Sequence, residues 1–441
     1  MIEKYLVKKI TEPVDWKVTV PGSKSMTNRA LLMAVLSAGT VRVEGVLFSD
    51  DSRHFLACLV ALGFTVEIEE EKKCVTVTGC GGRIPRGEAV IDVGSAGTAA
   101  RFLAAMLGFS DGCYEIRCSA QMKRRPMAAL FDLLSGAGAK ITFLEEEGHL
   151  PVRITGCRYA RADKTAGETP RELSLDITKS TQFLSALLLI APMFPEGMKI
   201  HITSEKTDGS YIRITRKMMQ EFGVSVAFDG RDYEVPCRSS YRKETYMVEP
   251  DMSAACYFYA AAAVTGGRAL VRHVHMDNTQ GDLRFLEVLE RMGCKADDTP
   301  EGVRVTGPAD GALRGITVNM NDFSDQALTL AAIAPFADAP VRIEGIGHIR
   351  GQECDRIHAI QTNLTALGIR CEEEETAATI YPGSPHGGSV ETYDDHRVAM
   401  AFSLVGLRTD GIVIENPACC RKTFENYFTV LSELTGKKTE A

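Results

Sequence analysis

The stretch Leu283–Gly293, LRFLEVLERMG, shows the pattern that decides the fold. Its apolar residues, among them Phe285, Leu286 and Leu289, fall at three- and four-residue steps, which predicts a helix with one buried face. Its closing glycine suits the left-handed cap with which many helices end. We therefore expect an amphipathic helix over this stretch, followed by a strand.

The same signal recurs along the chain, with its closing glycines 70 to 85 residues apart. Self-similarity at a regular period marks a chain built from repeated units. One more amphipathic helix, without the glycine, closes the series near the C-terminus. The six segments are Phe55–Gly63, Met127–Gly138, Tyr211–Gly223, Leu283–Gly293, Ile357–Gly368 and Phe424–Leu434.

A second set of segments, rich in alanine and apolar on nearly all sides, alternates with these helices. A helix without a polar face is buried. The alternation predicts six copies of a unit that contains a buried helix, a strand, an amphipathic helix and a strand, with three copies in each of two similar domains. The buried segments are Asn28–Ala38, Thr98–Leu107, Gln182–Ala191, Ser253–Val264, Asp325–Ala337 and His396–Leu407.

Polar and charged residues gather where the buried helices begin. Helix N-termini attract anions, because their free N–H groups and the helix dipole both favour negative charge. We expect these starts to meet at one end of each domain, around a cleft for ligands that carry several phosphate and carboxylate groups. The segments are Gly22–Thr27, Gly94–Thr98, Lys179–Gln182, Asp251–Ser253, Ser324–Gln326 and Asp394–Arg397.

Single residues in these segments also have simpler interpretations. Ser180 and Thr181 are typical helix caps. Arg29 and Arg101 lie inside apolar helices, where an unpaired charge is costly, so ligand contact and a structural ion pair remain equal alternatives. His396 follows two aspartates, but no third ligand has a suitable spacing, so we expect no metal site.

Composition excludes several classes of function. The 50 basic and 58 acidic side chains give a net charge of −8, which argues against a nucleic-acid partner. The longest apolar run, 183–194, is too short to cross a bilayer, so we expect no membrane association. Residues 1–9 carry charges where a secretory signal needs apolar residues, and the 13 cysteines form no CxxC pair. We expect a cytoplasmic protein with reduced thiols.

Several catalytic motifs fail. Gly22–Ser25 resembles the end of a phosphate-binding loop, but Lys17 stands where that loop needs its first glycine. GxGxxG, HExxH and GxSxG are absent from the sequence. Nucleotide hydrolysis, a dinucleotide cofactor, zinc proteolysis and serine hydrolysis therefore lose support.

An ordered set of motifs resembles the 5-enolpyruvylshikimate-3-phosphate synthase family of enolpyruvyl transferases. The resemblance implies an α/β fold of two similar domains, each of three βαβαββ units in an inside-out barrel, with the buried helices facing an interdomain cleft that holds the active site. It places residues 1–20 and 249–441 in the first domain and residues 21–248 in the second. The motifs are Pro21–Ala30, Gly94–Thr98 with Arg101, Ser180–Gln182, Asp395–Arg397 and Lys422–Phe424.

The resemblance implies a reaction of the shikimate pathway, which leads to chorismate and the aromatic amino acids. The 5-hydroxyl of shikimate 3-phosphate adds to the enol carbon of phosphoenolpyruvate, and the tetrahedral intermediate then loses phosphate. We expect these two anions as ligands, no metal or organic cofactor, a monomer, and domain closure on binding. The family is the target of glyphosate.

The resemblance also assigns site residues. Asp325 is expected to act as base, Glu353 as proton donor and Lys24 as their assistant. Expected contacts of shikimate 3-phosphate are Lys24, Ser25, Arg29, Ser180, Thr181, Gln182, Tyr211, Asp325, His348 and Gln352. Expected contacts of phosphoenolpyruvate are Lys24, Gly97, Thr98, Arg125, Gln182, Glu353, Arg356, His396, Arg397 and Lys422.

The sequence departs from the family at two positions expected to contact shikimate 3-phosphate. Two other functions also stay open. Gln352 stands where the family usually has lysine, and His348 where an amide is common. An enolpyruvyl transferase acting on UDP-N-acetylglucosamine would have Lys-Asn at Lys24 and Ser25 and would use a loop cysteine, for which Cys113 and Cys118 are candidates. A two-domain anion-binding protein without catalysis would leave Asp325 and Glu353 unexplained.

Overall fold

The computed structural model describes residues 3–157, 169–308 and 312–436. Contacts divide the chain into two compact units. Unit 1 comprises Met1–Pro21 and Pro250–Ala441, and unit 2 comprises Gly22–Glu249. The first domain is expected to begin at residue 1 and to end at residue 441, and both of these residues lie outside the described part of the chain.

The three sheets described in unit 2 share one pattern, in which a parallel pair of strands is extended by two antiparallel strands. This is the arrangement expected of a βαβαββ repeat, and where the two parallel strands are consecutive in the chain, a helix connects them. The orders are β14 (Thr245–Met247), β3 (Thr40–Glu44), β5 (Cys74–Thr78), β4 (Thr65–Glu69); β6 (Glu88–Asp92), β7 (Cys113–Arg117), β9 (Val152–Thr155), β8 (Lys140–Phe143); and β10 (Arg171–Leu175), β11 (Met198–Ile202), β13 (Asp232–Val235), β12 (Ala227–Phe228).

Unit 1 repeats the pattern twice, and its last sheet is a shortened copy with three described strands. In that sheet β1, from the start of the chain, pairs antiparallel with β23 in place of the usual antiparallel pair. The orders are β2 (Asp15–Val18), β15 (Arg268–Arg272), β17 (Gly302–Thr306), β16 (Lys295–Thr299); β18 (Thr317–Asn319), β19 (Val341–Glu344), β21 (Ala378–Ile380), β20 (Cys371–Glu373); and β22 (Gly388–Val390), β23 (Ile412–Glu415), β1 (Lys4–Leu6).

Each segment that passes between the units leaves a strand in the unit from which it departs. β2 comes just before unit 2 in the chain, but it pairs parallel with β15 of unit 1. β14 comes just before the return to unit 1, but it pairs parallel with β3 of unit 2. The first sheet of each unit is therefore completed by a strand distant in sequence.

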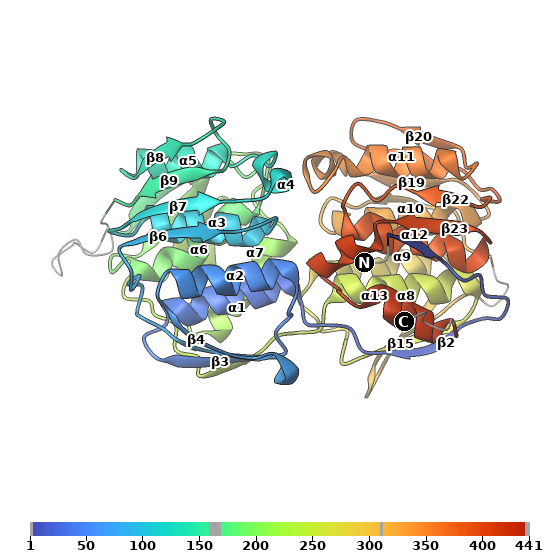
Figure 1. Cartoon of the computed structure of the whole chain (residues 1–441), viewed down its shortest axis with the longest axis horizontal. Helices are drawn as coiled ribbons and strands as arrows, with labels where there is room; N and C mark the ends of the chain where they lie inside the picture. The colour runs from blue at the N-terminus through green and yellow to red at the C-terminus, as the bar shows by residue number, and fades with distance from the viewer. Residues whose placement is uncertain (1–2, 158–168, 309–311, 437–441) are drawn as a thin grey trace. The chain divides into compact units, whose positions relative to one another are not determined.

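Three apolar helices pack against one another at the centre of each unit (Figure 1). Their side chains are buried on all sides, and each large apolar one contributes about 1.5–3 kcal/mol to folding. In unit 2 they are α1 (Lys24–Leu36), α3 (Gly97–Gly108) and α6 (Gln182–Ile190), and in unit 1 they are α8 (Met252–Thr265), α10 (Ala327–Ile333) and α12 (His396–Arg408).

The amphipathic helices have one face buried, and the central helices also contact the sheets directly. The amphipathic helices are α2 (Asp50–Ala61), α5 (Ala128–Gly136), α7 (Ser210–Glu221), α9 (Phe285–Arg291), α11 (Arg356–Ala366) and α13 (Tyr427–Leu434). Their order along the chain is the one that the repeat predicts.

Several predicted helices differ in their extent, among them Asn28–Ala38, which is observed as Lys24–Leu36. The one expected over 325–337 consists of a 3-10 turn η5 (Ser324–Gln326), α10 and a second 3-10 turn η6 (Ala334–Phe336). Pro335 ends the α-helical part, since proline lacks the N–H that the α-helix needs. The last helix starts at Tyr427 rather than at Phe424, after a 3-10 helix η8 (Pro417–Lys422). Among the described helices, none has the length and apolarity to span a membrane.

Candidate active site

The starts of the three central helices meet in unit 2, as the repeat predicts. Asn28 of α1 donates from Nδ2 to the Oγ1 of Thr98 in α3, at 2.6 Å. Arg101 of α3 donates from Nη1 to the Oε1 of Gln182 in α6, at 3.0 Å. The positive ends of three helix dipoles therefore share one region of this unit.

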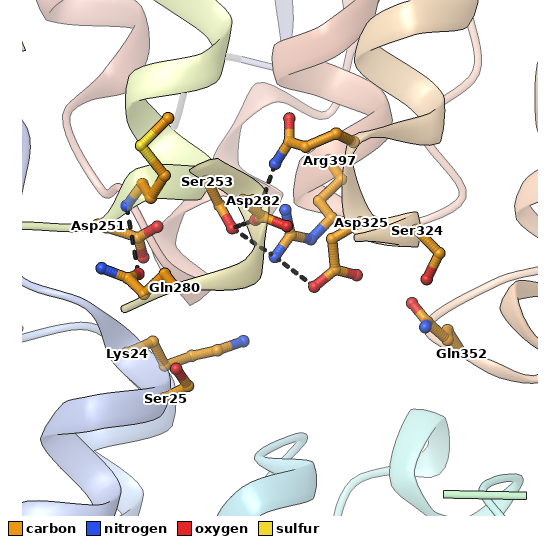
Figure 2. Close-up of polar contacts among 12 residues, drawn as sticks. Lys24, Ser25, Asp251, Ser253, Gln280, Asp282, Ser324, Asp325, Gln352 and Arg397 are labelled. Carbon is orange, nitrogen blue, oxygen red and sulfur yellow. Dashed lines mark hydrogen bonds and ion pairs between the residues drawn. The ribbon is translucent and has the colours of Figure 1, made fainter. Parts of the chain in front are cut away.

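Lys24 and Ser25 lie in the first turn of α1 (Figure 2). The Lys24 Nζ lies 3.4 Å from Oδ2 of Asp51, a carboxylate whose side chain is only 2% exposed. Ser95 donates to the other oxygen of Asp51, at 3.5 Å. Because the Lys24 side chain remains 18% exposed, its ammonium is held at the start of the helix with donors that a ligand can reach.

Gly97 allows two guanidinium groups to approach the start of α3. A Cβ added at this glycine would lie 2.4 Å from Nη1 of Arg125 and 2.8 Å from Nη1 of Arg101. Both distances are shorter than a van der Waals contact, so only glycine permits this arrangement. The two cations and the helix N-terminus make this a favourable position for an anion.

Arg29 is fully buried in unit 2. It donates from Nε to the Oγ1 of Thr215 at 2.8 Å and from Nη1 to the carbonyl oxygen of Ser25 at 2.8 Å, and it stacks over the rings of Phe102 and Tyr211. Burial lowers the pKa of Arg29 to about 10, which still leaves it protonated at neutral pH. These acceptors are neutral, so this arginine links α1 to α7 without a carboxylate, and its contact with a ligand stays a prediction.

At α6 the N-cap residue is Thr181, whose side chain makes no cap hydrogen bond, and the preceding residue is Ser180. Its hydroxyl oxygen accepts a hydrogen bond from the backbone N–H of Gln182, at 3.3 Å. Thr181 lies between them and, like both neighbours, is partly exposed. The hydrogen bond from Gln182 to Ser180 does not exclude a ligand, so a ligand contact stays a prediction for all three residues.

A dense charged cluster occupies unit 1, with Arg356 at its centre. Its guanidinium donates to Asp325 Oδ1 at 2.9 Å, to Glu353 Oε2 at 2.9 Å, to Asp395 Oδ2 at 2.7 Å and to the amide oxygen of Gln352. Its side chain is 1% exposed. Burial by itself lowers the pKa of Arg356, but the surrounding carboxylates outweigh burial and raise the pKa above its usual value. The sequence predicts most of these residues, but not that one cation joins them.

Two more cations extend this cluster. Arg397 donates from Nη2 to Asp325 Oδ2 at 3.0 Å (Figure 2), and the Lys422 Nζ lies 3.1 Å from Glu353 Oε1. Asp325 therefore lies between two guanidinium groups, and Glu353 between a guanidinium and an ammonium. The two carboxylates expected to move protons are thus held by the cations expected to bind phosphate.

The two histidines of the predicted site differ in their surroundings. His396 is buried, with its Nδ1 3.5 Å from Asp395 Oδ1. His348 is exposed, and its Nε2 shares a hydrogen bond with Ser324 Oγ at 2.7 Å. Within the described parts of the chain, no group of three or more His, Cys, Asp or Glu side chains is arranged to hold a metal ion.

Sequence reasoning did not assign a role to two further acidic partners of the cations. Asp51 holds Lys24, and Asp395 both holds Arg356 and accepts a hydrogen bond from the backbone N–H of Arg397 at 2.9 Å. Asp395 had a signal, since it immediately precedes a buried helix. Asp51 had only its place in the first turn of α2, where an acidic residue is common in any helix.

Comparison with known proteins decides the family. Residues 8–431 match the family described as EPSP synthase (3-phosphoshikimate 1-carboxyvinyltransferase). The chain belongs to this family. It is 41% identical over 429 residues to the 3-phosphoshikimate 1-carboxyvinyltransferase of Trichormus variabilis, covering 97% of this chain and 98% of that one. It is 38% identical to the enzyme of the same name from Yersinia pseudotuberculosis, covering 96% of each chain.

The solved structures of EPSP synthase agree. Two from Acinetobacter baumannii are each 25% identical to this chain and have TM-scores of 0.78 and 0.76. They cover 98% of this chain, and it covers 97% and 98% of theirs. The predicted two-domain inside-out α/β fold class and the assignment to a transferase family are therefore confirmed.

Proposed function

We propose that this protein transfers the enolpyruvyl group of phosphoenolpyruvate to the 5-hydroxyl of shikimate 3-phosphate and releases phosphate. The observation that carries the proposal is the alternation of Arg356, Arg397 and Lys422 with Asp325 and Glu353. A binding protein for anions needs only the cations, whereas addition to an enol phosphate also needs groups that move protons.

In the addition step, Asp325 removes the proton from the 5-hydroxyl while the oxygen bonds to the central carbon of phosphoenolpyruvate. Glu353, assisted by Lys24, gives a proton to the methylene carbon, so the double bond becomes a single bond and a methyl group forms. In the elimination step, the Glu353 carboxylate takes a proton back from that methyl group, the double bond returns, and the C–O bond to phosphate breaks with its electron pair leaving on phosphate. Each proton transfer by a positioned side chain contributes about 10²–10⁴-fold to the rate.

The cations have a second role in this proposal. When the phosphate and carboxylate of phosphoenolpyruvate bind to Arg356, Arg397 and Lys422, they compete with the side chains of Asp325 and Glu353. The two carboxylates then lose part of their pairing and become free to exchange protons. The same cations stabilise the charge that grows on the departing phosphate.

We infer that residues of both units serve this one reaction. Ser25, Arg29, Ser180, Thr181, Gln182 and Tyr211 of unit 2, with Asp325, His348 and Gln352 of unit 1, are proposed for shikimate 3-phosphate. The residues proposed for phosphoenolpyruvate, besides Arg356, Arg397, Lys422 and Glu353, are Gly97, Thr98 and Arg125 of unit 2 and His396 of unit 1. Lys24 and Gln182 are proposed to contact both ligands. Thirteen cysteines that are all free thiols suit the cytoplasm, and we propose that the enzyme is a monomer there.

The alternative acceptor UDP-N-acetylglucosamine is less well supported. That reaction would use a loop cysteine, and a reactive cysteine needs a lowered pKa. Burial instead raises the pKa of Cys118 to about 11. The site also has Ser25 after Lys24, where that alternative predicts asparagine.

Phosphate release with both substrates tests the proposal. We expect release that requires shikimate 3-phosphate and phosphoenolpyruvate together, and none with UDP-N-acetylglucosamine. Lys24→Met is expected to lower kcat by at least about 10²-fold, because it removes a charge at the reacting groups. Lys72→Met, at a lysine with a 70% exposed side chain, is the control and is expected to behave as wild type. Full activity of Lys24→Met would contradict the assignment.

Gly97→Ala tests the anion position at the start of α3. The new methyl group displaces the Arg125 guanidinium, so we expect the KM for phosphoenolpyruvate to rise roughly tenfold, equivalent to about 1.4 kcal/mol. The fold is expected to persist, because the displaced atoms end a flexible side chain. Gly136→Ala in α5, where an added Cβ meets nothing within 4 Å, is the matched control. An unchanged KM for phosphoenolpyruvate in Gly97→Ala would show that Arg125 does not bind this substrate.

A further inference from the structure

Asp282 is a buried carboxylate that the proposed mechanism does not use. It lies in a 3-10 turn, η4 (Gly281–Arg284), that leads into α9, and it is 8% exposed. Its Oδ2 accepts a hydrogen bond from Ser253 Oγ (Figure 2). It accepts a second one, at 3.0 Å, from Gln326 Nε2. Ser253 is in the first turn of α8, and Gln326 precedes α10. Asp282 therefore joins the starts of two central helices.

The hydrogen bonds around Asp282 have a fixed direction. Gln326 accepts at Oε1 from Thr329 Oγ1 at 2.9 Å, which turns its amide nitrogen toward Asp282. A serine hydroxyl has a single proton. When Ser253 donates that proton to Asp282, its oxygen lone pairs stay available to Arg397, whose Nη2 lies 3.3 Å away. The same Nη2 also donates to Asp325 at 3.0 Å.

We propose that Asp282 is a positioning residue that fixes Arg397, and through it Asp325, by orienting the hydroxyl of Ser253. The inference rests on the proposed function, because its measured effects are on phosphoenolpyruvate turnover. Asp282 itself is not expected to touch the substrate. Without its carboxylate, the Ser253 hydroxyl is free to rotate and to point its proton at Arg397, which would push the guanidinium away.

The charges that face Asp282 support this arrangement. Burial and the negative charge of Asp325 raise the pKa of Asp282 to about 6, while Arg397 opposes the rise. From α8, the Cys256 thiol also lies within its electrostatic environment. Since the folded pKa exceeds the ordinary value of about 3.9, the stabilising effect is present below about pH 4 and is lost as the pH rises through about 6. At neutral pH Asp282 is ionised and therefore can only accept hydrogen bonds.

Three variants, Asp282→Asn, Ser253→Ala and their combination, test the inference through kcat and KM for each substrate. We expect each single change to lower kcat/KM for phosphoenolpyruvate roughly tenfold, with KM for shikimate 3-phosphate unchanged. Since Asp282 acts through Ser253, the double variant is expected to lose roughly tenfold rather than roughly a hundredfold. Asp297→Asn, on the partly exposed strand β16, is the control and is expected to match wild type.

Two further readouts separate positioning from a merely structural role. Ser253→Thr keeps the hydroxyl and is expected to retain wild-type kcat/KM, and the fall in unfolding temperature from about pH 4 to about pH 6 is expected to be weaker in Asp282→Asn. Additive losses in the double variant, or equal losses in Ser253→Thr and Ser253→Ala, would overturn the inference. The serine pair decides the question even where Asp282→Asn does not fold. Absence of phosphate release by the wild type would instead overturn the proposed function.

Discussion

Replacing Arg356 with methionine is expected to lower the free energy of unfolding by about 3–5 kcal/mol and to abolish turnover. Methionine fills a similar volume, but it leaves Asp325, Glu353 and Asp395 close together without the cation that joins them. Uncompensated buried charge is among the most destabilising changes in a protein. Denaturant unfolding followed by circular dichroism gives the change in stability, and phosphate release gives the activity.

The loss of stability in Arg356→Met is expected to depend on pH. Its unpaired carboxylates take up protons more readily as the pH falls, so its deficit relative to wild type is expected to narrow from about pH 8 to about pH 5. Arg370→Met is the control, because its ion pair with Glu372 is exposed and contributes little. Wild-type stability of Arg356→Met at every pH would show that the cluster is not coupled.

Asp325→Asn is expected to lower kcat by about 10²–10⁴-fold, because it removes the proposed base. The amide still accepts one hydrogen bond from Arg356 or Arg397, but its NH₂ group then faces the other guanidinium. We therefore also expect the KM for phosphoenolpyruvate to rise. Steady-state kinetics with each substrate varied in turn separates the two effects.

Asp322→Asn provides the matched control for Asp325→Asn. It lies three residues earlier in the same loop and pairs with Arg284 at 3.5 Å, with side chains that are 36% and 48% exposed. We expect wild-type kcat for this variant. If Asp325→Asn kept the wild-type kcat while only KM changed, Asp325 would be a binding residue, and another group would have to act as base.

Periodicity predicts most of the fold because the pattern of burial repeats. The Ala-rich segments have no face that tolerates water, so their burial at the centre of each unit follows from sequence alone. Residue pattern does not reveal that β2 pairs with β15 and β14 with β3, because strand pairing depends on which partners lie nearby in space. The shortened α10 had a local signal in Pro335.

Some residues of the candidate site can likewise be predicted from the sequence, and others cannot. Cations such as Lys24, Arg125 and Arg356 stand out in a sequence because they lie at or just before the starts of helices. Buried carboxylates such as Asp51 and Asp282 do not stand out, because each looks like any surface acid until its burial is known. Resemblance to a family assigns the residues that contact substrate, but the network behind them becomes visible only in three dimensions.

The pairing of β1 with β23 has a consequence for how the chain matures on a ribosome. Translation proceeds at about 5–20 residues per second, so β1 emerges roughly 20–80 s before its partner. Unit 2 is a contiguous insertion and is fully emerged well before that moment. In nascent chains stalled between residues 250 and 412, all of unit 2 has therefore been synthesised, whereas β1 has no partner because β23 has not yet been made.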